Sequence, residues 1–158
     1  MSKESEINRE VDIRLRLIII KGGKVLLTYY SQEDYYSYVG GKLEYGETIA
    51  QGAQREIMEK CGEDTKFKFG KILYIRDYIS PPQGIHSVEL FLLGDINKFD
   101  ELEGRKDPGS GGKNWTTWRS IYNLPPNVYP TRLSQRLVED YINNFPNQGE
   151  YIGNIGIT

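Results

Sequence analysis

The apolar positions of the chain follow the period of a strand over several segments. Residues 11–20 alternate apolar and polar side chains and then become wholly apolar, which predicts a strand that enters a buried sheet. A Lys-Gly-Gly-Lys turn and a second apolar run follow, so residues 11–30 are expected to form a hairpin. Further strands are predicted at residues 66–80, with a bend near Gly70, at 85–96 and at 116–120.

Two segments have the helical period instead. The first spans Thr48 to Cys61, where Thr48 and Gln51 form a capping-box pattern and Gly62 is a natural stop. An arc of about 120° on this helix is its predicted buried face, and it holds Ile49, Ala50, Ala53, Ile57 and Cys61. The second helix is predicted at residues 130–145. The order of strands, helix, strands and helix predicts an α/β domain with a mixed sheet between helices.

The length of 158 residues fits one domain over residues 1–158. Residues 1–10 and 146–158 are expected to be loosely ordered tails, and residues 96–114 a long polar loop of the kind that usually has a function. The polar start lacks the apolar run of a signal peptide, and the apolar runs elsewhere are too short to cross a bilayer. A cytoplasmic location without membrane contact is therefore the expectation.

Charge and cysteine content narrow the partners. The net charge is −2 with no strongly basic face, which argues against nucleic-acid binding by bulk electrostatics. The single cysteine, Cys61, excludes a disulfide within the chain and a cysteine-rich metal site.

Three glutamates, Glu56, Glu59 and Glu63, crowd the end of the first helix together with Arg55 and Lys60. Taken alone they are consistent with a solvated helix face, because Arg55 with Glu59 and Glu56 with Lys60 are i,i+4 pairs. Gly52 lies within the same face and costs about 1 kcal/mol relative to alanine. It marks either the close approach of the Gly40–Gly41 loop or of a ligand, or no constraint at all.

The spacing to the preceding loop changes this interpretation. The chain resembles the Nudix family, whose box is G-x5-E-x7-R-E-U-x-E-E-x-G-U with U a bulky aliphatic residue. The matching positions are Gly41, Glu47, Arg55, Glu56, Ile57, Glu59 and Gly62. Two positions depart: Lys60 replaces the second glutamate of the Glu-Glu pair, and Glu63 replaces the closing aliphatic residue. The resemblance implies a Nudix-like α/β/α sandwich.

The resemblance also implies an activity, the hydrolysis of a nucleoside diphosphate linked to another group, with water attacking a diphosphate phosphorus. Catalysis would rely on Mg²⁺, or Mn²⁺ in its place, because the metal neutralises phosphoryl oxygens and acidifies water. The implied metal ligands are Glu56, Glu59 and the carbonyl of Gly40, with one glutamate activating water. Arg55 and Glu47 would pair and hold the loop onto the helix. A nucleotide-type substrate follows, and the family resemblance allows a homodimer.

Lys60 leaves two interpretations open. Its ammonium is expected to compete with the metal for Glu56, so the chain is either an enzyme with fewer metal ligands, in which Lys60 contacts a substrate phosphate, or a nucleotide- or sugar-phosphate-binding module with weakened catalysis.

The general base is a separate question. Its candidates are Glu101, Glu103 and Asp107 in the long loop and Glu89 in the strand at 85–96. A carboxylate in so apolar a strand must be paired or belong to the site, so Glu89 is also a candidate for substrate binding.

Overall fold

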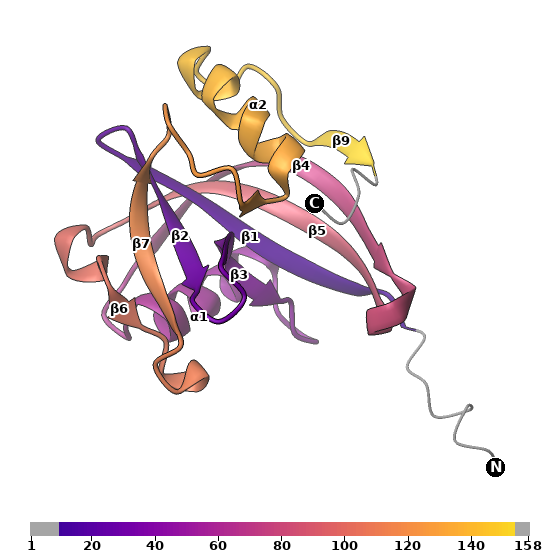
Figure 1. Cartoon of the computed structure of the whole chain (residues 1–158). Helices are drawn as coiled ribbons and strands as arrows, with labels where there is room; N and C mark the ends of the chain where they lie inside the picture. The colour runs from indigo at the N-terminus through magenta and orange to yellow at the C-terminus, as the bar shows by residue number, and fades with distance from the viewer. Residues whose placement is uncertain (1–9, 154–158) are drawn as a thin grey trace.

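The structure, a computed structural model, describes residues 10–153 (Figure 1). The strands are β1 (Asp12–Lys21), β2 (Lys24–Tyr30), β3 (Tyr35–Lys42), β4 (Phe67–Ser80), β5 (Ile85–Ile96), β6 (Arg105–Lys106), β7 (Asn114–Ser120), β8 (Val128–Tyr129) and β9 (Glu150–Gly153), and the helices are α1 (Ile49–Cys61) and α2 (Thr131–Ile142). Within residues 10–153 the short 3-10 helices are η2 (Pro81–Gln83), η3 (Asp100–Leu102) and η4 (Pro108–Ser110).

The strands form one mixed sheet in the order β6-β7-β2-β3-β1-β5-β4-β9, with β8 added beside β3. The pairs β1–β5, β3–β8 and β4–β9 are parallel and the other pairs are antiparallel. Helices α1 and α2 lie on opposite sides of the sheet (Figure 1). The predicted α/β/α sandwich with a mixed sheet is therefore confirmed.

Each side of the sheet carries its own apolar core. On the α1 side, Leu15 and Leu17 of β1 pack with Ile57 of α1 and Trp118 of β7. On the α2 side the core includes Ile18, Tyr38, Phe91, Leu133 and Leu137. Alternate residues of β1 thus enter opposite cores, as the pleat of a strand requires.

Helix α1 begins and ends as its sequence predicts. The Thr48 hydroxyl accepts from the Gln51 N–H at 3.1 Å, and the Gln51 side chain accepts from the Thr48 N–H at 2.9 Å. At the other end the Gly62 N–H donates to the Met58 carbonyl at 3.0 Å. The predicted bend near Gly70 is also present, because the pairing of β4 with β5 shifts register between Phe69 and Lys71.

Two expectations need correction. The expected loose tail at 146–158 contains β9, which pairs in parallel with β4, while Arg136 of α2 bonds the Glu150 carboxylate at its start. The expected tail at 1–10 and residues 154–158 lie outside the described residues, apart from Glu10. The polar loop at 96–114 is ordered by η3, β6 and η4, and β6 pairs with β7.

No helix within residues 10–153 is long and apolar enough to span a membrane.

Candidate active site

The two glycines at the end of β3 bring this strand close to its neighbours on both sides. A Cβ on Gly40 would lie 1.9 Å from the Leu15 carbonyl oxygen, so no other residue fits there without a shift of the backbone. A Cβ on Gly41 would lie 2.5 Å from Oε1 of Glu56, which comes from α1. The absence of a side chain at Gly41 therefore makes the space in which the Glu56 carboxylate lies.

Arg55 is the centre of the charged cluster. Its Nε and Nη2 donate to the two carboxylate oxygens of Glu47 at 2.6 and 3.0 Å, so the predicted Arg55–Glu47 ion pair is present and bidentate. Its Nη1 donates to Glu56 at 2.8 Å and to Glu59 at 3.3 Å. Its Nη2 also donates to the Lys42 carbonyl at 2.8 Å, which fastens the end of β3 to α1.

The cluster changes the acidity of its members. The hydrogen bonds from Arg55, helped by the Glu44 N–H, hold the pKa of Glu47 below its ordinary value. The hydrogen bond with Glu47 raises the pKa of Arg55 far above its own range, although burial acts in the opposite direction. The pair therefore favours a cationic Arg55 and an anionic Glu47 in the folded protein. Glu44, which sequence analysis did not single out, adds a carboxylate oxygen 3.6 Å from Arg55 Nη1.

The buried face of α1 differs from the predicted one. Gly52, Ala53, Glu56, Ile57 and Cys61 are buried, whereas Ala50 is exposed. Glu56 is only 5% exposed, because the space beside Gly41 and the bond from Arg55 accommodate its charge. The side chain of Glu59 remains 53% exposed on the same side of the cluster. The pair thus has one enclosed carboxylate and one that solvent or a ligand can reach.

Lys60 does not contact Glu56, contrary to the expected competition for that carboxylate. Its ammonium pairs with Asp107 at 3.3 Å, and its carbonyl accepts from Arg105 at 3.0 Å, so both contacts are with the segment that contains β6 and η4. The cation beside Glu56 and Glu59 is Arg55. The sequence did not predict the pairing of Lys60 with Asp107. A spacing of four residues brings Lys60 near Glu56 on the helix, but it does not show that a distant carboxylate competes for the ammonium.

The general-base candidates have separate surroundings. Glu103 accepts from the Thr117 hydroxyl at 2.7 Å and the Trp118 N–H at 3.1 Å, and Glu101 accepts from the Phe99 N–H at 2.9 Å, so both brace their own segment. Asp107 is the loop carboxylate that lies beside α1, through Lys60. Together with Glu59 and Lys60 it lines a cavity of about 400 Å³.

Glu89 lies on the other side of the sheet, away from α1. It is 2% exposed and accepts from Arg16 at 3.1 Å and from Arg76 at 2.7 Å. The expectation that a carboxylate in so apolar a strand is paired is therefore met, and the two arginines are residues that sequence analysis had not connected with it.

The donor atoms near α1 suit a hard cation. Within residues 10–153 no group of three or more His, Cys, Asp or Glu side chains is placed to hold a metal ion. Glu56 and Glu59, however, share one guanidinium nitrogen, Arg55 Nη1, so their oxygens point to a common position. Mg²⁺ commonly takes one or two carboxylates from a protein and completes its shell with water and phosphate. The two carboxylates fit that ion, provided that Nη1 yields its position to it.

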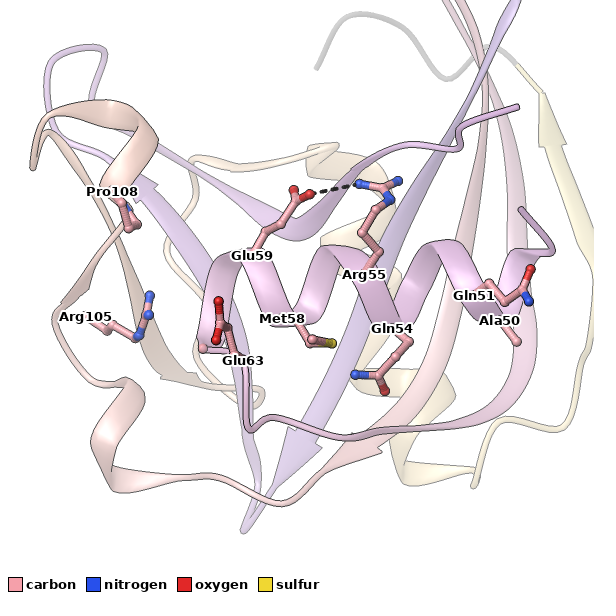
Figure 2. Close-up of a pocket in the computed structure, with 10 residues that line it drawn as sticks. Ala50, Gln51, Gln54, Arg55, Met58, Glu59, Glu63, Arg105 and Pro108 are labelled. Atoms are coloured by element: carbon pink, nitrogen blue, oxygen red, sulfur yellow. Dashed lines mark hydrogen bonds and ion pairs between the residues drawn. The ribbon is translucent and has the colours of Figure 1, made fainter. Parts of the chain in front are cut away.

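A cavity of about 780 Å³ runs along the outer face of α1 (Figure 2). Arg55 and Glu59 point to one side of the helix, and Met58 and Gln54 point to the other side. Arg105 and Pro108 close the groove from the segment that contains β6 and η4, whose Asp107 pairs with Lys60 of α1. A ligand could therefore reach Glu59 from solvent beside this groove.

Comparison of the sequence with protein-family models and with known proteins identifies relatives of the chain. A NUDIX domain model matches residues 14–133. The chain is 25% identical over 126 residues to the NAD-capped RNA hydrolase NudC of Pectobacterium atrosepticum, which covers 78% of this chain and 44% of that protein. It is 28% identical over 116 residues to the oxidized purine nucleoside triphosphate hydrolase of Danio rerio, covering 69% of this chain and 66% of that protein. The chain thus spans less than two thirds of the length of both relatives.

Solved structures share the fold at lower identity. A MutT NUDIX hydrolase from Burkholderia pseudomallei superposes with a TM-score of 0.66 at 21% identity and covers 83% of this chain and 98% of its own. An ADP-ribose pyrophosphatase from Streptococcus suis superposes with a TM-score of 0.62 at 15% identity, over 90% of this chain and 98% of its own. At these identities the likeness concerns the fold alone.

Proposed function

The chain belongs to the NUDIX domain family, and on that premise we propose that it is a Mg²⁺-dependent pyrophosphohydrolase of a nucleoside diphosphate linked to another group. The observation that carries the proposal is the arrangement around Arg55, where Glu56 and Glu59 share a guanidinium nitrogen beside Gly41. Both relatives described above, an NAD-capped RNA hydrolase and an oxidized purine nucleoside triphosphate hydrolase, are hydrolases of nucleotide-containing substrates.

In this proposal Glu56, Glu59 and the Gly40 carbonyl hold Mg²⁺ (or Mn²⁺), which supplies charge neutralisation at the diphosphate oxygens and a more acidic water. Glu56 is the enclosed ligand, and Glu59, being half exposed, meets the metal and substrate from solvent. One of the two accepts the proton of the attacking water. Arg55 and Glu47 act by orientation, because their bidentate pair fixes the loop against α1.

Lys60 has a different part in this proposal from that of a metal competitor. Its ammonium lies with Glu59 and Asp107 on a cavity wall, and from there it would contact an outer phosphate oxygen of the substrate. Asp107 is the loop carboxylate that lines the same cavity, and its ion pair with Lys60 would orient the ammonium toward the substrate. Both roles concern a nucleotide-type small molecule.

Activity measurements test the proposal. The protein is incubated with Mg²⁺ and a panel of nucleoside triphosphates, nucleotide sugars and dinucleotides, and release of phosphate-containing products is followed. At least one substrate should be turned over, and Glu56→Gln and Glu59→Gln should each lower kcat by about 100-fold or more. The matched control is Glu139→Gln, an exposed glutamate on α2, which should leave kcat unchanged. Full turnover by both cluster variants would show the roles to be wrong.

A binding module without catalysis is the second candidate, and one observation favours it. Arg55 Nη1 already occupies the position between Glu56 and Glu59. If the guanidinium keeps that position, nucleotide binding measured by calorimetry should not depend on Mg²⁺, and no substrate should be hydrolysed. Tighter binding in the presence of Mg²⁺ would exclude this candidate.

A further inference from the structure

Helix α1 covers only part of its side of the sheet. It packs against β3, β1 and β4, while the ends of β4 and β5 that η2 joins extend away from it (Figure 1). Ile13 of β1 lies two residues from Leu15 of the α1-side core and so points to the same side. Ile13 is opposite Val88 of β5, which is opposite Asp77 of β4. We call this part of the sheet the uncovered face, and its members are Ile13, Ile75, Asp77, Ile79, His86 and Val88.

The uncovered face is apolar where a solvated sheet would be polar. Strands that face water on one side place polar residues at the outward positions. Here Ile13 and Ile79 occupy such positions and are 40% and 41% exposed, and Ile75 and Val88 are half-buried. Tyr151 of β9 lies opposite Ile75 at the rim and is also largely exposed. A contiguous apolar patch of this kind is typical of a protein–protein contact.

Four side chains at the centre of the uncovered face form a quartet. Val88 lies opposite Asp77, and in the next row of the same two strands His86 lies opposite Ile79. The two apolar side chains thus lie on one diagonal of the quartet, and the carboxylate and the imidazole lie on the other. The His86 side chain is exposed, and Asp77 accepts a hydrogen bond from the Tyr151 hydroxyl at the rim.

We propose that the uncovered face binds a second copy of this chain through a two-fold axis along the Val88–Ile79 diagonal. In a two-fold contact, if one residue meets a second, the second also meets the first. This axis lays Val88 and Ile79 against their own counterparts and exchanges the other diagonal. Asp77 of each copy then meets His86 of the other, and an imidazole N–H can donate to a carboxylate. The quartet is therefore complementary to itself.

The chain's own N-terminal segment has too little apolar surface to cover this face. Residues 1–9 precede β1, and Met1 and Ile7 are their large apolar side chains among polar and charged ones. Burial of apolar area is the main favourable term in such a contact. A second copy supplies an apolar surface of equal size, together with a matching carboxylate and imidazole.

The size of the uncovered face sets the expected affinity. Strands about 4.8 Å apart, over about five residues of about 3.4 Å each, give four strands a face of about 300 Å² in plan. Standard interfaces bury about 800 Å² on each partner, so the face supplies the apolar centre and a polar rim must surround it. The dimer should accordingly be reversible, with a dissociation constant in the micromolar range.

Sedimentation velocity of the full chain tests the inference. Between about 1 and about 200 µM the protein should pass from monomer to dimer. Ile13→Lys and Ile79→Lys should each raise the dissociation constant at least about tenfold, because each buries an unpaired charge in the contact. The control is Ile142→Lys on α2, which lies on the other side of the sheet and is 66% exposed, and it should leave the dissociation constant unchanged.

A mixing experiment tests the two-fold pairing directly. Asp77→Lys and His86→Glu should each be monomeric over the same range, because each places like charges or two cationic groups in contact across the axis. An equimolar mixture should dimerise again, since Lys at position 77 of one copy then meets Glu at position 86 of the other. A structural defect within either variant would not be repaired by mixing. Circular dichroism confirms that both variants are folded before they are combined.

Two results would overturn the inference. A mixture that stays monomeric would show that Asp77 and His86 do not meet across the axis. An unmodified chain that stays monomeric at every concentration would show that a second copy does not cover this face. The inference is independent of the proposed hydrolysis, because the uncovered face holds none of the residues assigned to the metal or the substrate.

Discussion

Gly52 of α1 has close neighbours on the inner side of the helix. A Cβ at this position would lie 2.7 Å from Leu43 Cδ1, 3.0 Å from Leu15 Cδ1 and 3.2 Å from Glu47 Oε1. The glycine therefore marks a close approach of protein, namely the segment just after the Gly40–Gly41 pair and strand β1. Of the alternatives that the sequence left open, the absence of any constraint is the one that this packing excludes.

Replacing Gly52 by alanine should destabilise the protein. The change gains about 1 kcal/mol of helix propensity, but overpacking against Leu43 and Leu15 costs about 1–3 kcal/mol. We expect a net loss of free energy of unfolding of about 1 kcal/mol in urea denaturation. Gly109→Ala is the control, because a Cβ there would have one neighbour, Asp107 Oδ1, at 3.6 Å, and its φ is not positive. A stabilised Gly52→Ala would contradict the packing.

Local spacing predicted only part of the cluster. Arg55 and Glu47 were paired correctly, because both belong to one loop-helix unit whose geometry the motif describes. The burial of Glu56 and the direction of Lys60 were not predicted. Glu56 depends on the space beside Gly41 in another strand, and Lys60 depends on the place of Asp107, 47 residues further along the chain. Contacts between residues so far apart in the sequence do not appear in the hydrophobic period of either segment, so the sequence pattern does not predict them.

The segment from η3 to η4 lies beside the end of α1 and is tied to it by few contacts. Lys60 pairs with Asp107, and Arg105 donates to the Lys60 carbonyl. From its polar composition this segment was expected to be a plain loop. It is ordered because β6 pairs with β7 and because Glu103 binds the backbone and a hydroxyl of β7. These are individual polar contacts, which composition alone does not reveal.

A double-mutant cycle with Lys60→Met and Asp107→Asn measures the coupling free energy of the Lys60–Asp107 ion pair. Both side chains are partly exposed, so the coupling free energy should be about 0.2–1 kcal/mol and should shrink as salt is added. Asparagine retains an oxygen that can accept from the Gly109 N–H, as Asp107 does at 3.1 Å. The pair Lys21 and Asp95, 3.0 Å apart between β1 and β5, is a comparison that does not involve α1. Zero coupling at low salt would show that Lys60 does not hold this segment.

The free energy of unfolding of the whole molecule should fall in acid, because several carboxylates have lowered pKa values in the folded protein. The pKa values of four carboxylates are lowered: that of Glu47 by hydrogen bonds from Arg55, that of Asp64 by Lys98 and that of Glu150 by Arg136. The fourth is Asp12, where the effect of burial is outweighed by hydrogen bonds from Ser87 and Lys42. A lowered pKa in the folded state contributes stability above the unfolded pKa, and this is lost as pH falls through the folded value. Thermal unfolding temperature should therefore decline below about pH 4.5, the ordinary pKa of glutamate.

Arg136→Gln tests this account at one pair. The variant removes the partner of Glu150, so the pKa of Glu150 should return toward its ordinary value. We expect a lower unfolding temperature at pH 7 and a shallower decline in acid. Arg132→Gln, an exposed arginine on the same helix, should follow the unmodified protein at every pH. An unchanged acid profile in Arg136→Gln would contradict the role of the pair.

The layered architecture was predictable as a whole because its main elements are long. Strands of up to 14 residues and helices of 13 and 12 residues repeat their hydrophobic period several times, so the period can be recognised in the sequence. Strand β9 was missed because four residues hold too few alternations to separate a strand from a polar tail. The two-residue strands β6 and β8 have the same difficulty.

Both ends of the sheet oppose edge-to-edge assembly. Within the described residues one outermost strand is β6, which is two residues long and cationic, and the other is the short β9. Short, charged edges offer little backbone for another chain to extend the sheet. A homodimer, which stays a prediction, should therefore form through side-chain surfaces, and the monomer should resist the strand addition that begins amyloid-like aggregation.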